Sequence, residues 1–199
     1  VRRAPFQTIA ARIQSLCAGL RARRASEPGD LDVASTVAGL LHNLGTVENE
    51  AGLKEQALKR FELAVKHQLP AFAAAPEKRR SWLSNHFEMT ARMLRELGRP
   101  ADAVPATRER AKLWPKNGDA LLECAAEHAA CIASAKGESA ATIETWSAEA
   151  TGWIAAALAA GAKPETIAKD GRFASLQGRA DFKKLLASPA TPKPAPANR

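Results

Sequence analysis

Residues 43–64 read NLGTVENEAGLKEQALKRFELA and contain two helix-like segments joined by a short turn. Small residues and one phenylalanine recur in this stretch at helical spacing: Gly45, Gly52, Ala57, Phe61 and Ala64. Small side chains let two antiparallel helices approach closely, and the larger ring can fill the space toward the next element. We therefore expect a tight helical hairpin that turns at Gly52.

The hairpin pattern recurs farther along the chain. Shifting the sequence by 46 residues superposes GLKEQA at 52–57 on GRPADA at 98–103, and a weaker third copy surrounds Gly137. Each copy has a helix, a glycine turn and a second helix with an early alanine. A repeat of this length is typical of stacked helical hairpins, since one hairpin cannot bury its apolar face alone.

The chain has 199 residues, and its composition and its helix-breaking Gly and Pro residues predict an all-α fold. Hydrophobic residues make up 46% and aromatic residues only 5%, and no segment alternates apolar and polar positions as a strand would. We expect Pro70 to end a helix and leave a loose connection at 71–76, and Pro105 to distort another helix locally. The expected helices are 6–24, 31–50, 54–68, 77–97, 100–113, 119–135 and 140–160, followed by short segments at 164–167 and 180–186.

The first hairpin matches the tetratricopeptide pattern in Leu44-Gly45, Ala57-x-x-x-Phe61 and Ala64. Residues 80–133 resemble the tetratricopeptide arrays that follow the kinase domain in some large bacterial serine/threonine protein kinases. Residues 156–186 are similar to the segment that caps those arrays. The matching positions in the cap are Asp170, Phe173, Leu176, Gly178, Arg179, Asp181, Phe182 and Leu185.

The resemblance implies antiparallel helical hairpins stacked as a tetratricopeptide-like right-handed α-solenoid with a C-terminal cap. We expect an amphipathic N-terminal helix at 1–26, a repeat domain at 30–161, a cap at 162–187 and a disordered tail at 188–199. The N-terminal helix is best explained as part of a truncated upstream repeat. The first residue is Val, so we expect the chain to be a fragment of a longer polypeptide.

The formal net charge of +8 is concentrated at the two ends. Residues 1–24 carry six Arg and residues 183–199 carry three Lys and one Arg, all without acids, whereas the rest has a net charge of −2. This distribution argues against a nucleic-acid partner for the folded body. A basic adaptor that meets nucleic acid or anionic membrane through its Arg-rich start is the alternative function. No apolar run approaches the ~20 residues that a transmembrane helix needs.

The sequence favours a non-catalytic protein without a cofactor or metal. It lacks the Gly-rich loop, His-Arg-Asp and Asp-Phe-Gly motifs of a kinase. Cys124, His128 and Cys131 share one helix face and are zinc-type ligands, but no fourth ligand is evident, so we expect them to pack in the core. Three cysteines are too few for a disulfide framework, which favours the cytoplasm. We expect the four tryptophans to pack between hairpins.

The resemblance also implies a function and a surface. In tetratricopeptide arrays the first helix of each hairpin lines a concave face, so we expect a scaffold that binds a protein or peptide segment there, as the regulatory region of a kinase system. Arg92 and Arg95 lie one turn apart and could receive an acidic or phosphorylated segment. The alternative is a solvated face on which Arg95 pairs with Glu88 or Glu96. The sequence leaves the oligomeric state open. The predicted concave-face residues are His42, Thr46, Asn49, Asn85, Glu88, Arg92 and Arg95.

Overall fold

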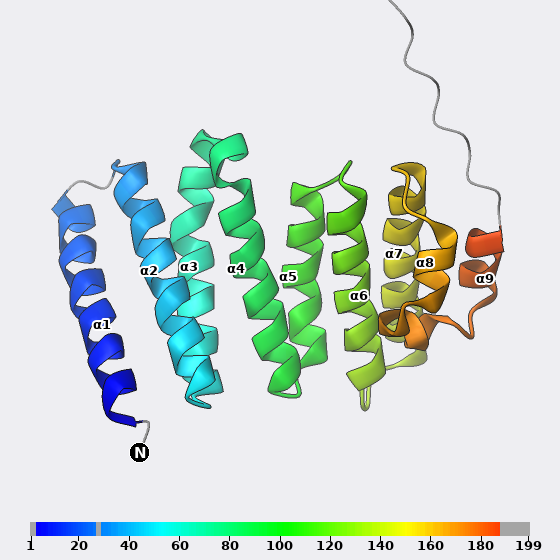
Figure 1. Ribbon diagram of the computed structural model, residues 1–199, viewed down its shortest axis with the longest axis horizontal. Helices are drawn as coiled ribbons and strands as arrows, with labels where there is room; N and C mark the ends of the chain where they lie inside the picture. Colours follow the sequence, from blue (N-terminus) through cyan, green and yellow to red (C-terminus); the bar gives the residue numbers. More distant parts are fainter. Residues whose placement is uncertain (1–2, 27–28, 188–199) are drawn as a thin grey trace, which may run out of the picture. The chain divides into compact units, whose positions relative to one another are not determined.

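The computed structural model describes residues 3–26 and 29–187, which contain helices and no strand (Figure 1). The predicted all-α fold is confirmed, and neighbouring helices stack on one another. The predicted tail at 188–199 lies outside the described residues. The helices are α1 (Arg3–Ser26), α2 (Leu31–Glu50), α3 (Lys54–Ala74), α4 (Pro76–Glu96), α5 (Pro100–Leu113), α6 (Gly118–Ser134), α7 (Ala140–Ala159), α8 (Pro164–Lys169), the 3₁₀ helix η1 (Gly171–Leu176) and α9 (Ala180–Ala187).

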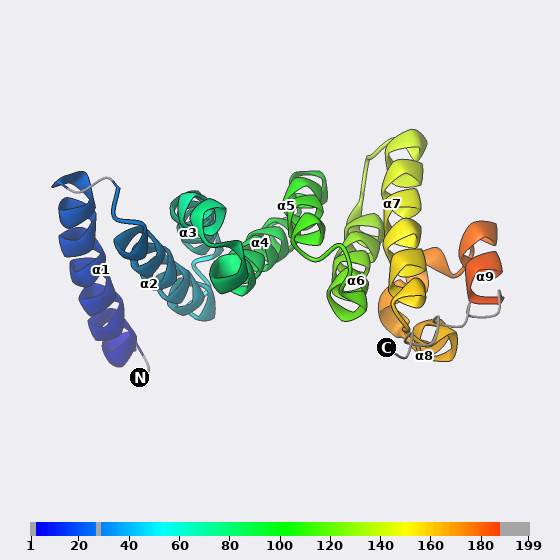
Figure 2. The same ribbon diagram turned by 90° about the horizontal axis from the view of Figure 1, so that it is seen from above.

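The chain divides into two compact units, the first ending at Arg99 and the second beginning at Pro100. In unit 1, α2 packs on α1 and α3, and α3 packs on α4 (Figures 1 and 2). Ile13 and Leu20 of α1 pack against the apolar core that α2 and α3 share. The side chains of Phe6, Ile9 and Cys17 lie outside the described residues, and Leu16 is 59% exposed.

The turns of the hairpins depend on glycine. Gly52 follows α2 with φ 80° and Gly98 follows α4 with φ 74°, a left-handed conformation that side chains with a Cβ disfavour. The N–H of Leu53 donates to the carbonyl of Glu48 at 2.9 Å, and the N–H of Gly52 donates to that of Asn49 at 2.9 Å. These two bonds satisfy carbonyls at the end of α2 that have no partner within the helix.

Two alanine substitutions in and after α2 should have opposite effects. Gly52→Ala should lower the free energy of unfolding by about 1 kcal/mol, because alanine resists a left-handed backbone. Gly39→Ala should raise it by about 0.5 kcal/mol or more, because Gly39 is inside α2 and a Cβ there would meet nothing within 4 Å. Urea unfolding followed by circular dichroism measures both. A neutral Gly52→Ala would show that the turn does not need glycine.

The close approach of α2 and α3 that residues 43–64 predict is confirmed. Ala57, Phe61 and Ala64 are all fully buried. A Cβ added to Gly45 would lie 3.0 Å from two ring carbons of Phe61 and 3.1 Å from the Cβ of Arg60. Even a methyl group at position 45 would therefore require Phe61 and Arg60 to move by a few tenths of an ångström.

The predicted break at Pro70 is wrong. Pro70 lies inside α3, which continues to Ala74, and only Ala75 separates α3 from α4. A proline inside a helix removes one backbone hydrogen bond. Ala71, one residue later, is only 2% exposed, and α3 packs on α4. Burial of the last turns thus offsets the local cost of Pro70, and the expected loose connection at 71–76 is helical except for Ala75.

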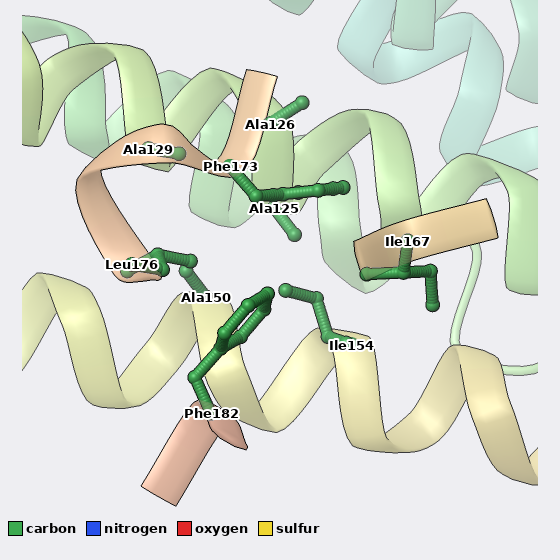
Figure 3. Close-up of a cluster of buried hydrophobic side chains, with 9 residues drawn as sticks. All are labelled: Ala125, Ala126, Ala129, Ala150, Ile154, Ile167, Phe173, Leu176 and Phe182. Carbon is green, nitrogen blue, oxygen red and sulfur yellow. The ribbon is translucent and has the colours of Figure 1, made fainter. Parts of the chain in front are cut away.

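The C-terminal elements of unit 2 cover the α6–α7 hairpin. Figure 3 shows the ring of Phe182 directed toward Ile154 of α7, with Phe173 and Leu176 of η1 beside α6 and α7. These three side chains from the predicted cap are at most 2% exposed. They close the apolar end of the hairpin. The other members of this core are Ala125, Ala126, Ala129, Ala150 and Ile167.

Candidate functional site

A pocket of about 610 Å³ lies between α2 and α4 in unit 1. Its wall residues recur at intervals of three and four along each helix, so one face of α2 opposes one face of α4. The lining residues are Asp32, Ser35, Thr36, Gly39, Leu40, His42 and Asn43 from α2, and Arg79, Trp82, Asn85 and His86 from α4.

One part of the pocket wall joins an ion pair to an aromatic ring. Arg79 donates from Nη2 to Asp32, and its guanidinium carbon lies 5.1 Å from the centre of the Trp82 ring. The Arg79 side chain is only 16% exposed, whereas Trp82 remains 50% exposed. A half-exposed tryptophan beside a guanidinium that is fixed by an ion pair offers a flat apolar surface to a ligand.

Two asparagines provide the uncommitted polar groups of the pocket. Asn43 on α2 and Asn85 on α4 are both exposed, and neither side-chain amide has a hydrogen-bond partner among the described residues. Each amide carries two donor hydrogens and one acceptor oxygen. The pair can therefore bind a ligand that presents both N–H and C=O groups.

Two histidines meet across the pocket. Nδ1 of His42 lies 3.0 Å from Nδ1 of His86, and the ring centres are 5.0 Å apart. His42 also contacts the ring of Phe61 edge-on, with 5.2 Å between the centres. His86 is only 3% exposed, and its Nε2 is buried without a hydrogen-bond partner among the described residues.

Both imidazoles are neutral at pH 7. Burial, with a smaller effect from the neighbouring His42, lowers the pKa of His86 to about 3. Burial also lowers the pKa of His42 from its ordinary value, although the charge of Glu88 acts in the opposite direction. These pKa shifts follow from the cost of holding a charge in a poorly solvated site.

The side of the pocket near α3 is fixed by a buried polar contact. The hydroxyl of Ser35 donates to Oε1 of Gln68 at 2.9 Å, and both residues are at most 1% exposed. Because buried hydrogen-bonded groups seldom change partners, this contact holds α2 in position against α3.

The predicted concave-face residues divide between the pocket and the adjoining surface. His42 and Asn85 line the pocket. Thr46 donates its hydroxyl to the carbonyl of His42 at 3.1 Å, so it is used within α2. Asn49 is half-buried outside the pocket lining, and Glu88 acts on His42 through its charge.

The predicted Arg92 and Arg95 pair lies in a network of surface charges. Arg92 donates from Nε to Glu96 at 2.9 Å, and Lys54 of α3 reaches the same carboxylate at 2.9 Å. Hydrogen bonding from Lys54 lowers the pKa of Glu96, and Arg92 adds to that effect. Arg95 also takes part in an interaction of its own. An incoming anion would have to compete with carboxylates that are already present.

Sequence reasoning missed Asn43, Arg79, Trp82 and His86. Trp82 was expected to pack between hairpins, and that prediction is wrong because half of this side chain is exposed. The signal was present in the spacing, since Arg79, Trp82 and Asn85 follow one another every three residues along α4. Extending the predicted concave-face positions toward the start of α4 would have included Arg79 and Trp82.

The predicted core role of Cys124, His128 and Cys131 agrees with their burial, since all three are 0% exposed. Nε2 of His128 lies 3.0 Å from Oε2 of Glu149, which also accepts a hydrogen bond from Arg108. The Trp153 ring stands edge-on to His128 with 4.5 Å between centres. Within residues 3–26 and 29–187, no three or more His, Cys, Asp or Glu side chains form a group that could hold a metal ion.

No protein-family model matches this sequence, and no significant match is found among curated proteins. Among the described helices, none is both long and apolar enough to cross a membrane.

Proposed function

We propose that this protein is a non-catalytic, tetratricopeptide-like scaffold that binds an extended segment of a partner protein in the pocket between α2 and α4. The observation that carries the proposal is the pairing of two uncommitted amides, Asn43 and Asn85, on opposite walls of one pocket. An extended peptide presents N–H and C=O groups at regular intervals, and a side-chain amide can bond both. The exposed face of Trp82 can receive an apolar side chain of the same segment.

The tetratricopeptide assignment is supported by the geometry of the first hairpin. Gly45 touches Phe61, Ala57 and Ala64 are fully buried, and Gly52 forms a left-handed turn. Stacking of such hairpins into a right-handed α-solenoid with a C-terminal cap is part of the proposal. We also propose a role as the regulatory region of a bacterial serine/threonine kinase system. The resemblance of residues 80–133 and 156–186 supports it.

An acidic or phosphorylated part of the partner would lie next to Arg92, farther along α4 than the pocket. Glu96 already bonds Arg92, so charge alone is a weaker anchor than the pocket. A cytoplasmic location is also proposed, and the free thiols of Cys124 and Cys131 support it. The alternative role of the basic start of the chain receives less support, because the partly buried Ile13 and Leu20 of α1 pack against the apolar core of unit 1.

A peptide library displayed on phage tests the proposal directly. Peptides selected on the full chain should bind the Asn43→Ala, Asn85→Ala double variant at least about tenfold more weakly, since two hydrogen bonds of roughly 1 kcal/mol each are lost. The matched control is Gln56→Ala, which removes an exposed amide on α3 outside the pocket. Equal binding to the double variant would place the site elsewhere. Acidic peptides should also bind more weakly to the Arg92→Glu, Arg95→Glu double variant.

A further inference from the structure

We propose that His42 and His86 form a proton-dependent link between α2 and α4 that controls the binding geometry of the pocket. The link regulates the site assigned above, so its effect on peptides rests on that proposed function. The positions of the hydrogens on the two rings can be tested without it. The inference begins from one contact, the 3.0 Å separation of two ring nitrogens that come from different helices and line the same pocket.

The contact fixes which hydrogens are present. A neutral imidazole has one N–H and one lone pair, so a bond between two Nδ1 atoms needs a hydrogen on only one of them. Among the described residues, no acceptor reaches the enclosed Nε2 of His86, and a buried N–H without a partner is costly. The hydrogen of His86 therefore belongs on Nδ1, which donates to Nδ1 of His42. The hydrogen of His42 is then on Nε2.

Adding a proton to either ring either breaks this hydrogen bond or creates a buried charge. The remaining basic atom of His42 is Nδ1, and a proton there would face the Nδ1–H of His86. Keeping the hydrogen bond would require His86 to move its hydrogen to Nε2, which is enclosed without an acceptor among the described residues, so protonation breaks the bond instead. The remaining basic atom of His86 is Nε2, where a proton would be a buried charge without a partner. The half-buried His42 is the ring that takes the proton as the pH falls, and the link between α2 and α4 is then lost.

The surrounding charges set the direction of the change. From α2 the pocket wall carries Asp32, which is paired with Arg79 of α4, and Glu88 of α4 favours a charged His42. From α3 the described contact with His42 is the ring of Phe61, which does not titrate. Since burial lowers the pKa of both histidines below the ordinary value of 6.5, the link is intact above that pH. It is lost as the pH falls below 6.5 and through the lowered pKa of His42.

Imidazole nitrogen NMR of the full chain tests the pair without any ligand. At pH 7.5 we expect His86 with its hydrogen on Nδ1 and His42 with its hydrogen on Nε2. The side-chain amide signals of Asn43 and Asn85 should shift with the same midpoint as His42. His86→Phe should raise that midpoint toward the ordinary value, because it removes the hydrogen bond to neutral His42, whereas His67→Gln should leave it unchanged. Two rings that both carry hydrogen on Nε2 at pH 7.5, or a spectrum altered by EDTA, would overturn the shared hydrogen.

Peptide affinity provides the second readout. The affinity of a library-selected peptide without His, Asp or Glu should fall as the pH is lowered from 7.5, with the same midpoint that NMR gives for His42, and His86→Phe should remove most of this dependence. His67→Gln is the matched control and should keep it. An affinity that does not change with pH, together with the expected tautomers, would refute control of the pocket while leaving the peptide site intact. If the library gives no peptide, the proposed function fails, and unchanged Asn43 and Asn85 signals would then refute the control by themselves.

Discussion

Arg110→Met should lower the free energy of unfolding of unit 2 by about 3–5 kcal/mol, because it leaves a carboxylate buried without its partner. Arg110 of α5 donates to Glu127 of α6, and the two side chains are only 10% and 11% exposed. Removing a charge from water is expensive, and only the opposite charge repays that cost. The measurement is urea unfolding at pH 7 followed by circular dichroism, with hydrogen exchange of the α5 and α6 amides as the local probe.

The double variant distinguishes the pair from simple loss of packing. Arg110→Met with Glu127→Leu should recover most of the loss, because no charge is then buried. Lys112→Ala is the matched control: Lys112 pairs with Glu109 in the same helix, but the side chains are 69% and 51% exposed. It should cost less than about 0.5 kcal/mol. A double variant as unstable as Arg110→Met would indicate lost packing instead of an unpaired charge.

Gly45→Leu should lower the free energy of unfolding of unit 1 by about 3 kcal/mol, the upper end of what overpacking costs in a tight core. Even the first added carbon would lie 3.0 Å from the ring of Phe61, which is fully buried and has little room to move. The remaining carbons of leucine can fit only if α2 and α3 separate. Hydrogen exchange of the α2 and α3 amides reports this change, and the α6 and α7 amides serve as an internal reference.

Gly39→Leu is the matched control for this prediction. It places the same side chain in the same helix, at a position where a Cβ would meet nothing within 4 Å. Its free energy of unfolding should not fall, and should rise by about 0.5 kcal/mol as in Gly39→Ala, because a helical glycine is replaced. Equal effects of the two substitutions would mean that leucine disturbs α2 itself and not its contact with α3.

Local signals in the sequence predicted most helix ends. Glycines that need a left-handed backbone, such as Gly52 and Gly98, can be recognised because few other residues tolerate that conformation. The resemblance of the closing segment singled out Phe173 and Phe182, and the structure buries both. Pro70 misled because its local cost is outweighed by tertiary packing, which depends on residues of another helix.

The candidate site was predictable only in part. The 46-residue repeat relates His42 to Glu88, but the structure brings His42 into contact with His86. A repeat identifies equivalent positions in two hairpins, and contacts join positions that are not equivalent. Trp82 was misassigned for a similar reason, since its size predicts burial but its place on α4 decides exposure. The pocket thus depends on the register between α2 and α4, which neither helix encodes alone.

The chain-order packing of unit 1 has a consequence for how the protein folds. The principal contacts join α1 to α2, α2 to α3 and α3 to α4, so each contact closes only a short loop. Loop closure costs little entropy at such separations, and chains with local contacts fold quickly. The α2–α3 hairpin, with Phe61 against Gly45, can form first and then serve as a template for α4. The pocket between α2 and α4 would accordingly be complete only after α4 docks, late in folding.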